Sequence, residues 1–172
     1  MIGALLLTPV VFVRYVMPIF IGHGAMKRLA FTPPPKGVER VAFCVYLLSM
    51  AAIFISLFFI KISVSSILFY IGVAFYGIGV LLYAVSVVHF GQPSEQGPNA
   101  EGVYRFSRNP IYVAFFLFLL GCALMTQSPV FFLFVVLYQI SVHWVILAEE
   151  RWCLAEFGDK YARYMRTVRR YL

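Results

Sequence analysis

The sequence predicts an all-α integral membrane protein with about five transmembrane helices, of which the last two form a tight hairpin, followed by a cytoplasmic C-terminal helix. Composition and the length of the apolar runs predict this class. Hydrophobic residues make up 62% of the 172 residues and charged residues only 12%, whereas roughly half of the residues in a soluble domain are apolar. The apolar runs approach the about 20 residues that a helix needs to cross the hydrocarbon core. We expect one small membrane domain with almost no soluble part.

Four apolar segments are clear candidates for membrane spans. Two of them carry no charge and are long enough to cross, and the other two are slightly short. The short pair is separated by three residues ending in Pro129, which can open a helix because its missing amide costs nothing there. We therefore expect a helical hairpin. Glycines in the second long span would let helices approach closely. The four spans are residues 41–60, 66–88, 111–126 and 130–147, and the glycines are Gly72, Gly77 and Gly79.

A fifth apolar segment, residues 2–21, contains one charge, Arg14. A guanidinium within the membrane is costly unless it is paired, hydrated or able to reach the interface. A cleaved signal peptide is the alternative, but a basic n-region is missing and no A-x-A site follows the apolar run. We expect a retained helix.

The distribution of basic residues predicts the orientation of the protein in the membrane. Lys and Arg gather in residues 22–40, in the loop after Val88 and in the tail after Leu147, whereas the opposite side offers only Lys61. With five spans all three basic regions lie on one face, which the positive-inside rule places in the cytoplasm, with the N-terminus outside. The net charge of +7 then reflects topology and contact with anionic membrane lipids, and we expect no nucleic-acid binding.

The sequence does not predict a metal site. The three histidines, His23, His89 and His143, lack the close His and carboxylate spacing of zinc or iron sites. The three cysteines have no CxxC spacing. We expect no metal cofactor.

The informative chemistry lies in two polar segments, of which the first runs from His89 to Pro110. It is too long for a simple turn between membrane helices, and its glycines and prolines allow sharp turns and close approach to a ligand. The simplest interpretation of Asn109 is a helix N-cap before Pro110 and nothing more. The functional interpretation is that this helix N-terminus, with Arg105 and Arg108 beside it, binds a carboxylate or phosphate.

The second polar segment begins with Glu149 and Glu150, where the last span meets the cytoplasm. Topology does not require these carboxylates, because the positive-inside rule is insensitive to acidic residues. One interpretation is an amphipathic tail whose glutamates pair with the many arginines, while Trp152, Tyr161 and Tyr164 anchor it in the membrane interface. The other interpretation is a binding site.

Taken together, the two segments follow a joint pattern: G-x-Y-x-x-x-R-(H/N)-P-x-Y, two spans in a hairpin, and then E-E-x₆-F-G-x-x-Y-x-x-Y. This pattern resembles the isoprenylcysteine carboxyl methyltransferase and phospholipid methyltransferase superfamily over roughly residues 89–172. The joint spacing is far more specific than any single element. The matching residues are Gly102, Tyr104, Arg108, Asn109, Pro110, Tyr112, Glu149, Glu150, Phe157, Gly158, Tyr161 and Tyr164.

The resemblance implies a membrane-embedded enzyme that binds S-adenosylmethionine in a cytoplasm-facing pocket and methylates a lipid-like or hydrophobic small molecule. It divides the chain into N-terminal spans, residues 1–88, and a cofactor-binding module, residues 89–172. No Rossmann domain is needed. The implied cofactor-binding residues are His89, Gly102, Val103, Tyr104, Asn109, Pro110, Tyr112, Glu149 and Glu150. The catalytic candidates are Glu150 and Arg108.

The chemistry of this cofactor agrees with the residue types present. Its ammonium group needs a carboxylate, its carboxylate needs helix amides or arginine, and its sulfonium favours aromatic faces. We expect Glu149 and Glu150 to hold the amine, and Tyr104 and Tyr112 to pack near the adenosine or sulfonium. Methyl transfer needs mainly alignment and exclusion of water, with a base only if the nucleophile must lose a proton. The candidates for such a base are Glu150, His89 and His143.

Departures from the family pattern bear on the methyl acceptor. Asn109 stands where the family usually has histidine, which keeps the hydrogen bonding but removes a titratable ring. Val145 stands where the eukaryotic prenylcysteine enzymes carry an arginine linked to substrate recognition, which argues against a prenylcysteine carboxylate. The family's V-P-R near the end is only partly kept, as Val168-Arg169-Arg170. Phospholipid amines, small thiols and other hydrophobic acceptors stay open.

Two rival functions belong to other classes. The sterol reductases share a related C-terminal module and bind NADPH there, but they carry many more spans than this chain. A non-catalytic membrane scaffold is the second rival, and it would show no saturable binding of S-adenosylmethionine.

Overall fold

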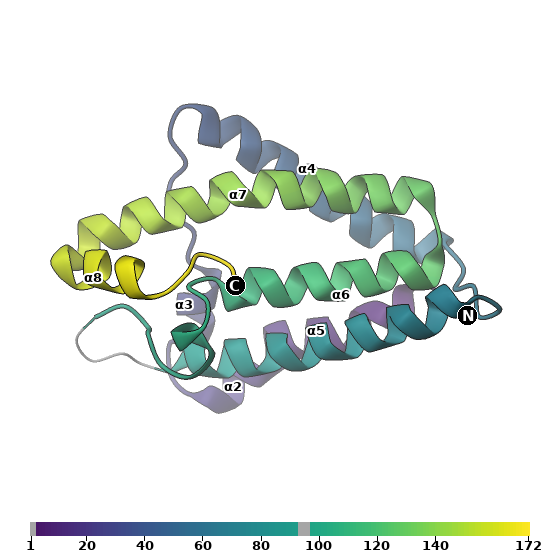
Figure 1. Ribbon diagram of the computed structural model, residues 1–172, viewed down its shortest axis with the longest axis horizontal. Coiled ribbons are helices and arrows are strands. Elements are labelled where there is room, and N and C mark those ends of the chain that lie inside the picture. Colours follow the sequence, from purple (N-terminus) through teal and green to yellow (C-terminus); the bar gives the residue numbers. More distant parts are fainter. Residues whose placement is uncertain (1–2, 93–96) are drawn as a thin grey trace.

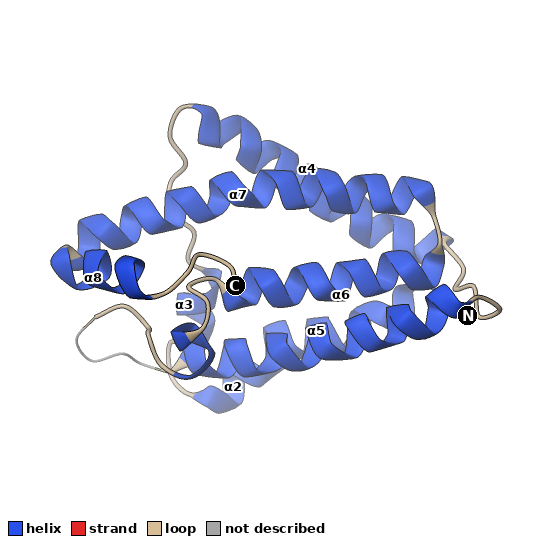
Figure 2. Cartoon of the chain, viewed as in Figure 1, coloured by secondary structure: helices blue, strands red, loops and turns tan. Residues whose placement is uncertain are grey.

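The computed structural model describes residues 3–92 and 97–172, and every element that it describes is helical apart from short connections (Figures 1 and 2). The predicted all-α class is confirmed. Pro93, within the first polar segment, lies outside the described residues. The elements in chain order are η1 (Gly3–Leu7), α1 (Thr8–Val11), η2 (Phe12–Val16), α2 (Met17–Ile21), α3 (Ala25–Ala30), α4 (Val38–Phe59), α5 (Ile67–Gly91), η3 (Gly102–Arg105), α6 (Pro110–Thr126), α7 (Pro129–Phe157) and α8 (Asp159–Thr167).

Four helices in the described chain are long and apolar enough to cross a membrane. They are α4, α5, α7 and the continuous N-terminal helix Gly3–Ile21, which comprises η1, α1, η2 and α2. The remaining candidate, α6, is apolar but has only 17 residues. The count of five spans and the placement of the N-terminus outside therefore stay predictions.

The connection between α6 and α7 is the tight helical hairpin that the sequence predicts. Gln127 adopts the left-handed backbone conformation, with φ of 49°. The Ser128 hydroxyl then accepts a hydrogen bond from the Phe131 amide at 3.3 Å and caps α7, which begins at Pro129. α7 continues past the expected end of its span to Phe157, so both glutamates of the second polar segment lie on the helix itself.

The helices pack as two pairs joined at one end of the molecule. α5 lies along α6, and α4 lies along α7, whereas α6 and α7 share a smaller interface. Two backbone hydrogen bonds tie the joined end, from the Gly3 amide to the Ile60 carbonyl and from the Ser63 amide to the Met125 carbonyl, each 2.9 Å. In Figure 1 this end lies at the right, beside the α6–α7 turn, and α8 lies at the left.

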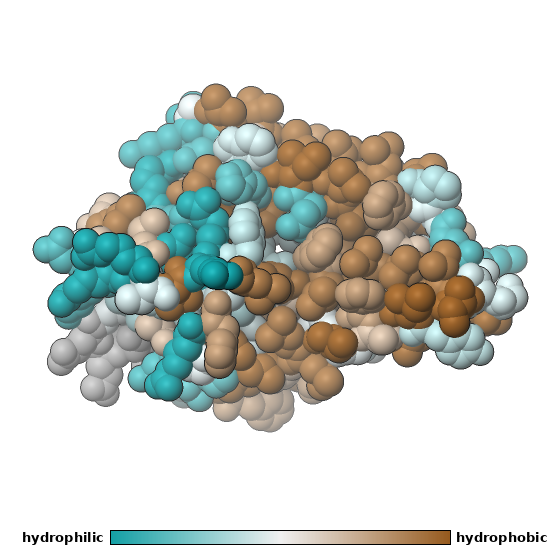
Figure 3. Space-filling view, viewed as in Figure 1, coloured by the Kyte–Doolittle hydropathy of each residue, from teal (hydrophilic) through white to brown (hydrophobic). Residues whose placement is uncertain are grey.

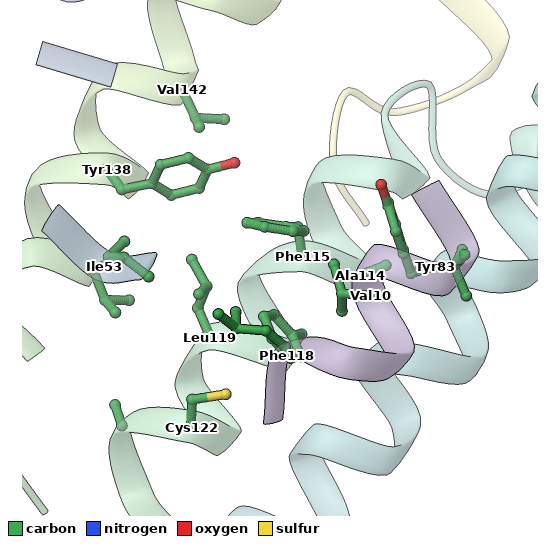
Figure 4. Close-up of a cluster of buried hydrophobic side chains, with 14 of the residues drawn as sticks. Val10, Ile53, Tyr83, Ala114, Phe115, Phe118, Leu119, Cys122, Tyr138 and Val142 are labelled. Atoms are coloured by element: carbon green, nitrogen blue, oxygen red, sulfur yellow. The ribbon is translucent and has the colours of Figure 1, made fainter. Parts of the chain in front are cut away.

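The apolar core lies where the two pairs converge. Ile53 of α4 and three side chains of α6, Phe118, Leu119 and Cys122, are fully buried there (Figure 4). Hydrophobic residues also cover the outer faces of the long helices, as contact with lipid requires, whereas hydrophilic residues gather mainly at the α8 end (Figure 3). The molecule therefore has one apolar body and one mainly polar end.

Two glycines of α5 set its close approach to α6. A Cβ atom on Gly79 would lie 2.4 Å from the Phe118 amide nitrogen, and one on Gly72 would lie 2.9 Å from the Gly121 carbonyl oxygen. The predicted close approach is confirmed at these two positions. It is wrong for Gly77, which has nothing within 4 Å, because five residues along a helix from Gly72 lead to a different face.

These two environments predict opposite effects of adding one methyl group to α5. Gly79→Ala should lower the Tm of the detergent-solubilised protein, because overpacking a close contact costs about 1–3 kcal/mol. Gly77→Ala is the matched control and should leave the Tm unchanged or raise it, because alanine is favoured over glycine in a helix by about 0.5–1 kcal/mol. Equal changes in Tm for the two variants would contradict this packing.

Candidate active site

A cavity of about 640 Å³ lies between the two helix pairs and extends to the end of the molecule that carries α8. Its volume falls within the roughly 300–1,000 Å³ typical of small-molecule sites. Side chains from the N-terminal helix, the four later long helices, α3, α8 and the polar loop all contribute to its wall. Tyr83 and Tyr138 lie at the edge of the apolar core and also line the cavity (Figure 4).

Glu149 is the one carboxylate that lines the cavity among the described residues. It accepts a hydrogen bond of 2.5 Å from the Tyr112 hydroxyl, which comes from the first turn of α6. Among the described residues, no Lys or Arg nitrogen lies within 4.0 Å of it. This side chain therefore faces the cavity with the Tyr112 hydroxyl beside it and, in the described part of the chain, no Lys or Arg nitrogen at close range.

Glu150, the next residue, is held in a different way. Its side chain is only 5% exposed and contacts two guanidinium groups, with Arg108 Nη2 at 2.8 Å from Oε1 and Arg170 Nη2 at 2.8 Å from Oε2. The hydrogen bonds to Glu150 raise the pKa of the Arg170 guanidinium. Paired charges of this kind are what burial of a carboxylate requires. The predicted pairing of tail arginines with a glutamate is thus present at Glu150, which does not line the cavity.

The C-terminal tail, residues 168–172, returns along the start of α6 and fixes it. The Arg108 amide donates to the Arg169 carbonyl at 2.9 Å, and the Asn109 side chain donates to the Arg170 carbonyl at 3.0 Å. Asn109 occupies the N-cap position of α6, but its side chain makes no capping hydrogen bond. The expectation of a side-chain cap is therefore wrong, because the amide group is used to hold the tail.

Three tyrosines close the cavity at its polar end. Tyr104 of η3 is buried, and its carbonyl accepts a hydrogen bond of 2.6 Å from the Tyr164 hydroxyl of α8. Burial raises the pKa of the Tyr104 phenol well above its usual value, so the phenol stays neutral. Tyr161 and Tyr164 are buried and line the cavity. Their predicted role as anchors in the membrane interface is wrong, because they face the interior.

His89 lies behind this wall. Its imidazole packs against Gly102, where a Cβ atom would lie 2.5 Å from the ring and where φ is +57°, so only glycine fits without strain. The His89 carbonyl accepts a hydrogen bond of 2.5 Å from the Asn99 side chain. His89 and Gly102 therefore shape the loop that carries Tyr104.

The structure divides the residues that the sequence predicts for the site into two groups. The roles of all of them in binding or catalysis stay predictions. Those that line the cavity are Tyr104, Arg108, Asn109, Tyr112 and Glu149. Those outside its wall are His89, Gly102, Val103, Pro110 and Glu150.

Sequence reasoning missed the contribution of the N-terminal half to the cavity. Arg14 and Arg28 line it, together with Tyr46 of α4. One signal was available, because a charge within an apolar span, as at Arg14, is expected to face a cavity or a functional site. The spacing of the other residues in the N-terminal half does not predict that they line this cavity.

The family of the chain follows from its match to known proteins. A family model of phospholipid methyltransferases matches residues 60–160, which is more than half of the chain. The chain belongs to the phospholipid methyltransferase family. No curated protein and no solved structure gives a significant match.

Membership in the phospholipid methyltransferase family makes the protein a membrane methyltransferase and confirms the resemblance found in the sequence. The matched residues comprise α5, η3, α6 and α7, which supply Tyr104, Tyr112 and Glu149. The N-terminal helix, α3 and all of α4 precede the match. The arginines of the N-terminal half therefore belong to a part of the cavity wall that the family pattern does not cover.

The double contact of Glu150 predicts a strong effect on stability. Glu150→Gln should destabilise the protein by about 3–5 kcal/mol, because it leaves the buried Arg108 guanidinium, and the partly exposed one of Arg170, without their carboxylate. The lowered Tm should be accompanied by faster tryptic cleavage of the tail, which contains several arginines. Glu39→Gln is the matched control, because Glu39 also contacts one arginine, Arg151, but that pair is more exposed and should contribute at most about 1 kcal/mol. Equal effects of the two substitutions would contradict the structural role of Glu150.

Proposed function

We propose that this membrane methyltransferase transfers a methyl group from S-adenosylmethionine to the amine of a phospholipid at the cytoplasmic face of the membrane. The observation that carries the proposal is the Glu149 carboxylate, which faces a cavity of about 640 Å³ without a cationic partner among the described residues. Membership in the phospholipid methyltransferase family supports the type of acceptor.

The residues around the cavity fit the charged groups of the cofactor. Glu149 offers a carboxylate to its ammonium group, with Tyr112 fixing one oxygen. Asn109 and Ile111 bring the start of α6, with its partial positive charge, to the same wall, where the carboxylate of the cofactor would bind. Phe90 and Tyr104, whose rings lie 6.0 Å apart, offer aromatic faces to the adenine or the sulfonium.

The protein's contribution to the reaction is alignment and exclusion of water. When bound, the cofactor supplies an electrophilic methyl group on a cationic sulfur. The residues of the cavity wall would hold the unprotonated acceptor amine in line with that methyl group, so that the N–C bond would form as the S–C bond breaks. S-adenosylhomocysteine would leave as the product, and the proton of the methylated ammonium would pass to water. Glu150 and Arg108 bind each other and the tail, so we propose them as positioning residues that fix the start of α6 rather than as a base.

The two substrates would reach the cavity from different sides. The polar loop and α8 border its polar end, where the cofactor would enter from the cytoplasm. On the membrane side, the N-terminal helix contacts α4 mainly through η1, and the two helices then diverge. Val11 and Tyr15 of the N-terminal helix and Phe54 of α4 line the cavity between these two helices, and the first two are exposed. A lipid would enter there.

The proposal is tested by incubating membranes that contain the protein with methyl-labelled S-adenosylmethionine and separating the lipids. We expect the label in a phospholipid that co-migrates with an N-methylated standard, and none in membranes that lack the protein. Saturable cofactor binding with no labelled product would contradict the acceptor. An absence of saturable binding would favour the non-catalytic scaffold, and binding of NADPH instead would favour the reductase.

The assignment of Glu149 predicts a loss of cofactor affinity on removal of its charge. Glu149→Gln should weaken binding of S-adenosylmethionine by about 1.5–3 kcal/mol, the contribution of one hydrogen bond to a charged group, as measured by calorimetry. Glu156→Gln is the control, because Glu156 is an exposed carboxylate on the same helix outside the cavity. Unchanged affinity of the Glu149 variant would rule out the assigned role.

A further inference from the structure

Arg14 occupies an unusual place in the N-terminal helix. It lies on the π-helical turn η2, Phe12–Val16, and its side chain lines the cavity. Single π-helical turns inside α-helices are rare and occur frequently at functional sites. An ionisable residue within a membrane span is costly, and it persists where it faces a bundle interior or serves a function.

The guanidinium of Arg14 has little of its charge offset by the described residues. Its Nη2 donates to the Leu29 carbonyl at 2.9 Å, and among residues 3–92 and 97–172 no carboxylate oxygen lies within 4.0 Å of it. A guanidinium has five N–H donors in a planar fork, so one neutral carbonyl leaves most of them available. Such a group in a cavity wall is suited to bind an anion.

A second arginine lies on the same wall. Arg28 precedes Leu29 in α3, so the short helix that anchors Arg14 also carries Arg28. Its Nη2 donates to the Gly91 carbonyl, while its buried Nε has no hydrogen-bond partner among the described residues. Neither arginine forms an ion pair in this part of the chain. The N-terminal half therefore gives the cavity a cationic side.

Tyr46 lines the same cavity as Arg14 and Glu149. Its ring packs 5.3 Å from that of Tyr138, which also lines the cavity. Toward the joined end of the bundle, where Gly3 meets Ile60, the wall is apolar and includes Val11 and Phe54. From the joined end toward the polar end, the wall thus offers an apolar surface, a cation and then the proposed methyl-donor site.

We propose that Arg14, with Arg28 beside it, binds the phosphodiester of the lipid acceptor and so determines which acceptors are used. This inference rests on the proposed function. The order of groups in an amine-bearing phospholipid, acyl chains, phosphate and then amine, matches the order of surfaces in the cavity wall. The planar fork of an arginine binds a phosphate group with two parallel hydrogen bonds, which fixes its orientation. The amine would then be held toward Tyr46 and the methyl donor.

The test compares acceptors and ligands with and without the phosphodiester. In the detergent-solubilised protein, Arg14→Gln should raise KM for phosphatidylethanolamine by about 10- to 100-fold, as expected for loss of a hydrogen-bonded charge contact, with a much smaller change in kcat. KM for hexadecylamine, which has no phosphate, should change far less. In native mass spectrometry, dihexadecyl phosphate should bind the unmodified protein and bind Arg14→Gln more weakly. The affinity of Arg14→Lys for this ligand should fall between those of the other two proteins.

Controls separate this inference from the proposed function and from misfolding. Arg40→Gln is the matched variant, because the Arg40 guanidinium also contacts a backbone carbonyl, that of Pro35, but is exposed outside the cavity, and it should leave every readout unchanged. Calorimetric affinity for S-adenosylmethionine should be the same in the Arg14 variants as in the unmodified protein, which reports an intact fold.

Either of two outcomes would contradict a phosphodiester site at Arg14. An equal rise in KM for both acceptors would assign Arg14 to the fold or to the cofactor. Competition by inorganic phosphate as strong as that by dihexadecyl phosphate would indicate a site for a free anion instead of a lipid. If the protein binds no S-adenosylmethionine, the proposed function fails, and the binding of dihexadecyl phosphate to the unmodified and Arg14→Gln proteins still decides the inference.

Discussion

The buried contact of Glu150 with Arg108 and Arg170 is the interaction on which the site depends. It joins α7, the segment before α6 and the C-terminal tail at one point, although these lie far apart in the sequence. A carboxylate with so little exposure is costly unless its charge is matched, and two guanidinium groups match it here. Because Arg108 also donates to the Met165 carbonyl, the same cluster holds the end of α8. Within the described residues, this cluster ties together the elements that form the polar end of the molecule.

The adjacent Glu149 has a different task because of helix geometry. Successive residues on an α-helix point about 100° apart, so two neighbouring glutamates cannot face the same side. Glu150 points to the tail and the arginines, and Glu149 points into the cavity toward Tyr112. The cluster fixes the start of α6 and therefore also the position of Tyr112. Glu150 thus fixes the helix ends that surround Glu149, which faces the cavity.

The sequence was sufficient for those features that depend on local physics. Apolar length predicts the long helices, Pro129 predicts the hairpin, and joint spacing predicts the family. The features that depend on tertiary contacts could not be predicted from the sequence. The Asn109 side chain was expected to cap its own helix, but the tail offers it the Arg170 carbonyl. One interpretation of the tail places Tyr164 at the membrane interface, whereas its hydroxyl donates to the carbonyl of Tyr104 inside the molecule. In each case a partner about 60 residues away replaced a local interaction.

The same limit explains why the N-terminal half was not assigned to the cavity. No motif in residues 1–59 matches the family, and the packing that brings Arg14 to the wall depends on α3 folding back so that the Leu29 carbonyl meets its guanidinium. Yet a bundle of this size must use those residues. A site that accepts both a charged cofactor and a lipid needs a cation and an apolar surface next to its carboxylate, and α5 to α7 also have to hold each other together. The first helices therefore have two tasks: they pack against α5 and α7, and they supply the part of the cavity wall, with Arg14 and Arg28, that precedes the family match.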